Sequence, residues 1–150
     1  MEGRESRERH VAALAQRQHG VVTTRQLAAA GIGKAGIEHR VKHGRLVRLH
    51  RGVFQVGPVA APRGREMAAL LACGEDAALS HHSAAAVWGF RPEHEGDVHV
   101  TTTAQGRSRQ GIQVHRTHSL KAAVDVRRRC PPDKRTGGHW GRPPRSKEAF

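Results

Sequence analysis

Hydrophobic residues recur with a helical period at the start of the chain. Between residues 5 and 18, the positions i, i+3, i+4 and i+7 are occupied by Val11, Leu14, Ala15 and Gln18. This spacing places them on one narrow face of a helix, and Gly20 follows as a stop signal. The pattern therefore predicts a first helix over residues 5–18, with an apolar stripe that ends in a polar side chain.

A second helix has a complete start signal. Thr23 and Gln26 have the spacing of a capping box, and Val22 and Leu27 are placed around it as a hydrophobic staple. The helix predicted from this signal covers residues 24–30, before a glycine-containing turn.

A third helix is predicted from about residue 34 to residue 43, where Gly44 stops it. Its apolar positions, Ile37 and Val41, lie one turn apart, so the remaining face is polar and basic. After Gly44 the period shortens towards two, which predicts strands over residues 46–49 and 53–56 joined by a tight turn. Three helices followed by a basic hairpin are typical of a winged helix-turn-helix, whose third helix enters the major groove of DNA.

The second half of the chain shows a different arrangement. Pro58 and Pro62 mark a hinge, and a helix is predicted over residues 63–73. Ser80 is placed to cap another helix that ends before Gly89. Alternating positions near residues 98–102 and 112–115 predict a two-stranded ribbon packed on these helices.

The predicted fold class is therefore α+β, with three parts. A winged helix-turn-helix covers residues 1–60, a small α+β unit covers residues 61–120, and a basic tail covers residues 121–150. The tail has no apolar periodicity from about residue 121, and we expect it to be disordered.

Composition excludes several classes of protein. Aromatic residues make up 3% of the chain and Tyr is absent, so the aromatic platforms that stack single-stranded bases are not expected. The longest apolar run, residues 67–73, is far shorter than the ~20 residues that a membrane span needs. The first ten residues alternate acidic and basic side chains where a signal peptide would be apolar. Cys73 and Cys130 have no metal or disulfide spacing. These features indicate a cytoplasmic protein without a membrane partner.

The chain carries a formal charge of +13, and the distribution of this charge is informative. Residues 25–65 hold nine basic residues and one acidic residue, which gives +8, whereas residues 66–120 carry −2 and residues 121–150 carry +6. A charge run by itself is usually a solvated face. A localised patch on a predicted winged helix favours a docking surface for double-stranded DNA.

The basic patch falls on the elements that a winged helix presents to DNA. The predicted contact residues are Arg25, Lys34, Glu38, His39, Arg40, Lys42, Arg45, Arg48 and Arg51. Lys34, His39 and Lys42 would approach base edges or phosphates. Arg45, Arg48 and Arg51 would bind phosphates or the minor groove. Glu38 would accept from a cytosine amino group, or pair with Lys34 or Lys42 on the helix surface.

Other motifs give little support to an enzyme. Residues 31–36 match G-x-G-x-x-G, but a helix precedes them where dinucleotide binding needs a strand, so we interpret these glycines as a turn. No G-x-S-x-G elbow occurs, and no Glu has a Lys two positions later. The pairs His81–His82 and His115-x-x-His118 lack a cysteine or carboxylate at ligand spacing. We therefore expect no catalytic residues, no metal and no cofactor.

Several segments, in order, resemble AbiEi-type antitoxins of bacterial type IV toxin–antitoxin systems. They read GVVTTRQL at residues 20–27, GI at 31–32, GRL at 44–46, LHRGVF at 49–54, LSHHSAAAVWGF at 79–90, DVHVT at 97–101 and GIQVHR at 111–116. The resemblance covers about residues 8–120. It departs from the family pattern at Gly33, where relatives often have a Ser or Thr helix cap, and again from residue 127 onwards.

The resemblance implies a transcriptional repressor that binds operator inverted repeats upstream of its own operon. It also implies a partner, a nucleotidyltransferase-like toxin that the antitoxin neutralises. Many relatives carry a C-terminal endonuclease-like domain, and here the end of the chain resembles a truncation or a frame shift. An alternative hypothesis is a protein-interaction fragment of a nuclease-linked defence protein without its catalytic domain, with residues 66–120 as the functional surface.

Overall fold

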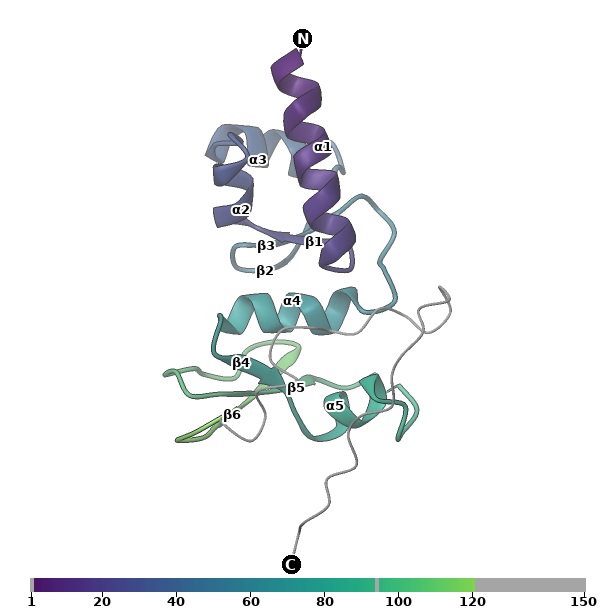
Figure 1. The fold of residues 1–150 in the computed structure, drawn as a ribbon, viewed down its shortest axis with the longest axis vertical. Coiled ribbons are helices and arrows are strands. Elements are labelled where there is room, and N and C mark those ends of the chain that lie inside the picture. Colours follow the sequence, from purple (N-terminus) through teal and green to yellow (C-terminus); the bar gives the residue numbers. More distant parts are fainter. Residues whose placement is uncertain (1, 94, 121–150) are drawn as a thin grey trace, which may run out of the picture.

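The computed structural model describes residues 2–93 and 95–120, and the predicted disordered tail lies outside these residues. Eleven elements follow one another in this part of the chain (Figure 1). They are α1 (Glu2–Arg17), β1 (Val21–Thr23), α2 (Thr24–Ala29), α3 (Lys34–Lys42), β2 (Leu46–His50), β3 (Val53–Val56), α4 (Gly64–Cys73), β4 (Ala77–Leu79), α5 (His81–Val87), β5 (Val98–Thr102) and β6 (Ile112–Arg116). The α+β class predicted from the sequence is confirmed. None of the helices in the described residues is both long and apolar enough to cross a membrane.

The first six elements form a winged helix-turn-helix. The helices α1, α2 and α3 pack on a three-stranded antiparallel sheet with the strand order β1-β3-β2. The predicted positions of the three helices and of the hairpin are confirmed. The strand β1 was missed, because its three residues were interpreted only as the approach to a helix cap.

The start of α2 is held by the predicted capping box. The Thr23 hydroxyl accepts a hydrogen bond from the Gln26 amide at 3.2 Å, and the Thr23 amide donates to the Gln26 side chain at 2.9 Å. Gln18, the polar residue that ends the apolar stripe of the first helix, belongs to the same network. Its side chain and that of Gln26 donate hydrogen bonds of 2.8 and 3.0 Å to each other. Gln18 therefore fixes the end of α1 against the start of α2.

The core of the winged helix lies between its helices and its sheet. Its buried residues are Val11, Ala15, Val22, Leu27, Ile32, Ile37, Leu46 and Phe54. All six elements contribute to this core at positions that the hydrophobic pattern singled out, and Ile32 joins them from the turn between α2 and α3. Burial of this apolar surface is what holds α3 in a fixed orientation.

The helix α4 lies between two sheets (Figure 1). Met67 and Ala68 are buried against Val21 and Val53 of the winged-helix sheet. Ala69 lies in a separate core with residues of β4, β5, β6 and α5. The division of the chain near residue 60 remains a prediction, and α4 contributes to the cores on both sides of it.

The second sheet differs from the predicted ribbon, which was wrong in its number of strands. It has three strands in the order β4-β5-β6. The pair β4 and β5 is antiparallel, and the pair β5 and β6 is parallel, with Val98 opposite Ile112 and Thr102 opposite Arg116. The strand β4 is three residues long and fully buried, so it shows no alternation from which a strand could be predicted.

Candidate nucleic-acid interface

The turn between α2 and α3 sets the position of the third helix. Gly31 has a φ of +79°, a conformation that favours glycine. The Ile32 amide then donates to the Leu27 carbonyl at 2.9 Å, and the Ile32 side chain is buried in the core. Of the three glycines in the G-x-G-x-x-G match, Gly31 and Gly33 therefore belong to this turn, whereas Gly36 lies within α3. Gly33 occupies the N-cap of α3 and provides no side-chain hydrogen bond.

The helix α3 buries one side and exposes the other. Ile37 is buried and Val41 is partly buried against the same core. On the opposite side Lys34, Glu38, His39 and Lys42 are all exposed, as is Ala35 between them. The sequence-predicted residues of this helix other than Arg40 thus lie on the face that points to solvent.

Two histidine rings lie in contact at the end of this face, tilted relative to each other. The ring centroids of His39 and His43 are 4.1 Å apart, and Nδ1 of His43 lies 2.7 Å from the His39 carbonyl oxygen. His43 was not among the predicted contact residues. Because it follows the last turn of α3, its ring extends the exposed face towards β2.

Arg48 lies on the edge strand β2, which packs against α3, and Arg45 directly precedes this strand. The Arg45 amide donates to the Arg40 carbonyl at 2.9 Å, which continues α3 directly into β2. The Arg48 guanidinium lies 5.3 Å from the centroid of the Phe54 ring, a cation–π contact that orients an otherwise exposed side chain. Both side chains reach solvent beside α3, since β2 packs against this helix.

Arg40 points in a different direction from the rest of the set. Its guanidinium forms a salt bridge with Glu8 of α1 at 2.5 Å and donates to the Gly36 carbonyl at 3.1 Å. These contacts connect α3 with α1. The side chain is only 18% exposed, much less than the rest of the basic face.

Arg25 and Arg51 lie together at a second place, a groove between the winged helix and α4. The turn of the β2–β3 hairpin meets the start of α2 here, where the Thr24 amide donates to the Gly52 carbonyl at 2.9 Å. Residues of α4, among them Met67, Leu70 and Leu71, line the same groove. The predicted contact residues therefore form two groups, and Figure 1 shows α2, α3 and the hairpin turn on the same side of α1.

Two arginines of α1 join these groups and were missed by sequence analysis. Arg17 lines the groove of Arg25 and Arg51. Arg7 lines a hollow with His39, Arg40 and Arg45, and its guanidinium donates to the Gly31 carbonyl at 3.4 Å. Their position beside the predicted contact residues depends on the fold. The sequence of α1 does not indicate it, because basic and acidic residues alternate along this helix.

Comparison with known proteins identifies a family that matches the first part of the chain. Residues 9–57 match a family described as transcriptional regulators, AbiEi antitoxins. The resemblance predicted from the sequence is confirmed for this segment, which extends from α1 to the residue after β3. The description is that of a regulator and not of an enzyme.

Similarity to solved structures is at low identity, as one example shows. It is the RV2827C protein from Mycobacterium tuberculosis, which is 23% identical, with a TM-score of 0.43. The match covers 75% of this chain and 45% of that protein, so the chain spans less than half the length of this relative. No curated protein matches the chain.

Proposed function

We propose that this protein is a DNA-binding transcriptional regulator of the AbiEi antitoxin type, without catalytic activity, that acts in the bacterial cytoplasm. It binds inverted repeats upstream of its own operon and represses transcription. The observation that carries the proposal is the exposed face of α3 with His39 and Lys42, next to the strand β2, which contains the exposed Arg48 and is preceded by the exposed Arg45. This face belongs to the segment that matches the family.

The dimensions and the charge of α3 suit the major groove. Its nine residues span about 13 Å, and a helix with its side chains is about as wide as the groove. Lys34 and Lys42, at the two ends of the helix, would contact phosphates or guanine edges. Glu38 is the acidic residue between them and would accept from a cytosine amino group.

The remaining basic residues have separate roles in the proposed complex. Arg45 and Arg48 bind the phosphates that border the groove next to α3. A second group of arginines binds the phosphate backbone further along the DNA duplex. It comprises Arg17, Arg25 and Arg51, which line the groove at the start of α2 and the hairpin turn. Arg40 supports the position of α3 through Glu8 and does not contact DNA.

A binding titration with matched variants tests the proposal. The full chain is titrated against labelled DNA from upstream of its own gene and against a shuffled duplex, over a series of salt concentrations. The double variant Arg45→Ala/Arg48→Ala is expected to lose at least about tenfold in affinity. Its slope of log K against log salt should fall by about 0.9 for each lost phosphate contact.

The control is a double variant with the same loss of charge on the second unit. Arg107 and Arg116 are exposed there, and Arg107→Ala/Arg116→Ala should keep both the affinity and the salt slope close to those of the wild type. Equal losses in the two double variants, or equal binding of both duplexes by the wild type, would refute the proposed repressor.

We also propose a protein partner, a nucleotidyltransferase-like toxin encoded by a neighbouring gene. The surface of residues 61–120 is the better candidate for this contact, since residues 66–120 carry −2 and the Phe90 side chain is 78% exposed. Co-purification of the full chain with that gene product should weaken in Phe90→Ser and remain in Arg45→Ala/Arg48→Ala. Loss of the complex only in the second variant would place the contact on the winged helix.

A further inference from the structure

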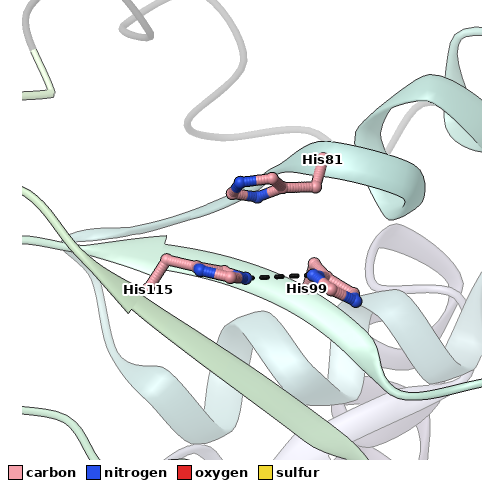
Figure 2. Close-up of side chains that lie close together, drawn as sticks. All are labelled: His81, His99 and His115. Carbon is pink, nitrogen blue, oxygen red and sulfur yellow. Dashed lines mark hydrogen bonds between the residues drawn. The ribbon is translucent and has the colours of Figure 1, made fainter.

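Three histidines from separate elements converge on the outer side of the second sheet. His81 is the first residue of α5, His99 lies in β5 and His115 lies in β6 (Figure 2). One nitrogen of each imidazole lies within 4.8 Å of the other two. Residue spacing along the chain gives no indication of this cluster, because His81 and His115 belong to two different sequence pairs and His99 to neither.

The rings face one another closely. Nδ1 of His99 lies 2.9 Å from Nε2 of His115, and their rings are stacked with centroids 5.1 Å apart. The His81 ring covers them, with its centroid 4.1 Å from that of His115. Figure 2 shows His81 above the strands and the other two rings below it, with one nitrogen of His115 directed at one nitrogen of His99.

Strand register explains why two of the histidines share a face. Val98 and Val100 are buried in the core, so the side chain of His99 between them points to the opposite side of the sheet. In the parallel pair, Thr101 is opposite His115. His99 lies two residues before Thr101 and therefore on the same side as His115.

The start of α5 is bound to the backbone of His99, and this places His81 above the sheet. The Ser80 amide donates to the His99 carbonyl at 2.9 Å, and the His99 amide donates to the Ser83 hydroxyl at 2.8 Å. Ser80 stands at the N-cap, as predicted, but makes no side-chain cap bond. Its hydroxyl lies instead 3.0 Å from Nδ1 of His81 and orients that ring.

The backbone of His81 is also unusual. Its φ of +48° lies in the left-handed region, which non-glycine residues rarely adopt. Such conformations persist where the surrounding structure fixes them, and they concentrate at binding sites. The conformation turns the His81 side chain towards His99 and His115.

We propose that His81, His99 and His115 bind one divalent transition-metal ion of the zinc type. Imidazole nitrogens are preferred ligands of such ions, and tetrahedral coordination with bonds of 2.0–2.1 Å separates two ligand nitrogens by about 3.3 Å. The nitrogens of the cluster lie at separations around this value, from 2.9 Å to less than 4.8 Å. Small rotations of the side chains therefore suffice to surround a cation.

The contact between the two strand histidines shows how their rings are arranged without a metal ion. Nδ1 of His99 and Nε2 of His115 are at hydrogen-bond distance, 2.9 Å apart, so one ring donates its N–H and the other accepts with its lone pair. A metal ion could replace this shared proton, because each neutral imidazole keeps one lone pair that can be directed at a single cation. One metal ion satisfies three lone pairs at once, whereas one shared proton satisfies two.

Three histidine ligands leave one position of a tetrahedral ion for water or another donor. Among residues 2–93 and 95–120, no cysteine or carboxylate joins the three histidines as a fourth ligand. The bound ion would cross-link α5, β5 and β6, and would therefore stabilise the second unit.

Metal uptake by the full chain tests the proposal. The protein is produced without a polyhistidine tag, stripped with a chelator, dialysed against Zn²⁺ and analysed for metal content. We expect one equivalent of zinc, and cobalt substitution should give the visible absorption of a tetrahedral site. At a free Zn²⁺ concentration of 100 times Kd, the ratio of folded to unfolded protein should rise about 100-fold.

Variants at the ligands and at other histidines distinguish this site from non-specific binding. His81→Gln and His115→Gln should each weaken zinc binding by about tenfold or more and abolish the cobalt spectrum. His81 is exposed, so His81→Gln is expected to remain folded, as circular dichroism can confirm. His43→Gln and His118→Gln serve as controls and should bind zinc as the wild type does. No retained zinc, or equal retention in ligand and control variants, would overturn the proposal.

Discussion

The carboxylate of Glu8 on α1 and the guanidinium of Arg40 on α3 form a salt bridge of 2.5 Å. Residues far apart in the sequence thereby fasten the first helix to the helix that we propose to enter DNA. Arg40 also donates to the Gly36 carbonyl one turn earlier, so both ends of its guanidinium are held within the protein. This arrangement separates a residue that positions α3 from the residues that would contact DNA.

The replacement Glu8→Gln should therefore affect stability more than DNA binding. The Glu8 side chain is 45% exposed, so solvent screens the pair, and its loss should lower the free energy of unfolding by less than about 1 kcal/mol. The affinity for operator DNA should change by no more than about twofold. Urea unfolding and anisotropy titration measure the two effects, with Glu5→Gln on the same helix as the control. An increase in affinity of tenfold or more would mean that the released Arg40 binds phosphate.

Glu38 provides a test of sequence reading by α3. Replacement by Gln removes a negative charge from the exposed face, so affinity for a shuffled duplex should increase. Loss of the cytosine contact should at the same time lower the ratio of specific to non-specific affinity by about fivefold or more. Titration of both duplexes at one salt concentration measures this ratio. An unchanged ratio would assign Glu38 to a helix-surface ion pair with Lys34 or Lys42.

Local signals explain which parts of the winged helix could be predicted from the sequence. The capping box of Thr23 and Gln26 involves residues three positions apart, so the start of α2 is encoded in one short segment. The turn at Gly31 and the hairpin turn before Val53 have the same local character. Each of these features involves residues only a few positions apart, and the local backbone geometry leaves such a segment few alternative conformations.

Features that depend on distant contacts could not be predicted in this way. The strands β1 and β4 have three residues each, too few for an alternating pattern to appear. The convergence of His81, His99 and His115 depends on the parallel pairing of β5 with β6 and on the packing of α5 against β5. Arg40 had the same sequence signature as Lys42, and only the position of Glu8 in the fold distinguishes their directions.

The N-terminus of α3 offers a stabilising substitution. Gly33 has φ −73° and ψ 176°, which any residue adopts, and a side chain there would meet no atom within 4 Å. Gly33→Ser should add a cap hydrogen bond and reduce the freedom of the unfolded chain, raising the free energy of unfolding by about 0.5–1 kcal/mol. Gly31→Ala serves as the matched comparison and should lower the free energy of unfolding. The φ of +79° at Gly31 is unfavourable for alanine, and the added Cβ would lie 3.3 Å from the Arg7 side chain. Stabilisation by both substitutions in urea unfolding would contradict this account of the turn.

His50 should make the stability of the protein depend on pH. It lies at the end of β2, close to Gly111 of the second unit, and burial, with a further effect of the Arg109 charge, lowers its pKa. The unfolded chain therefore binds a proton at this ring at a higher pH than the folded chain. The stabilisation from neutral His50 is complete above the ordinary histidine pKa of about 6.5 and is lost as the pH falls below it towards the pKa in the folded protein.

Urea unfolding at about pH 7.5 and pH 5.5 measures this effect. Between these two pH values, the free energy of unfolding should decrease less in His50→Gln than in the wild type. Arg109→Gln should give an intermediate decrease in the free energy of unfolding, because it removes the Arg109 charge, the smaller of the two causes that lower the His50 pKa. Identical losses in the wild type and His50→Gln would show that other histidines account for the pH dependence.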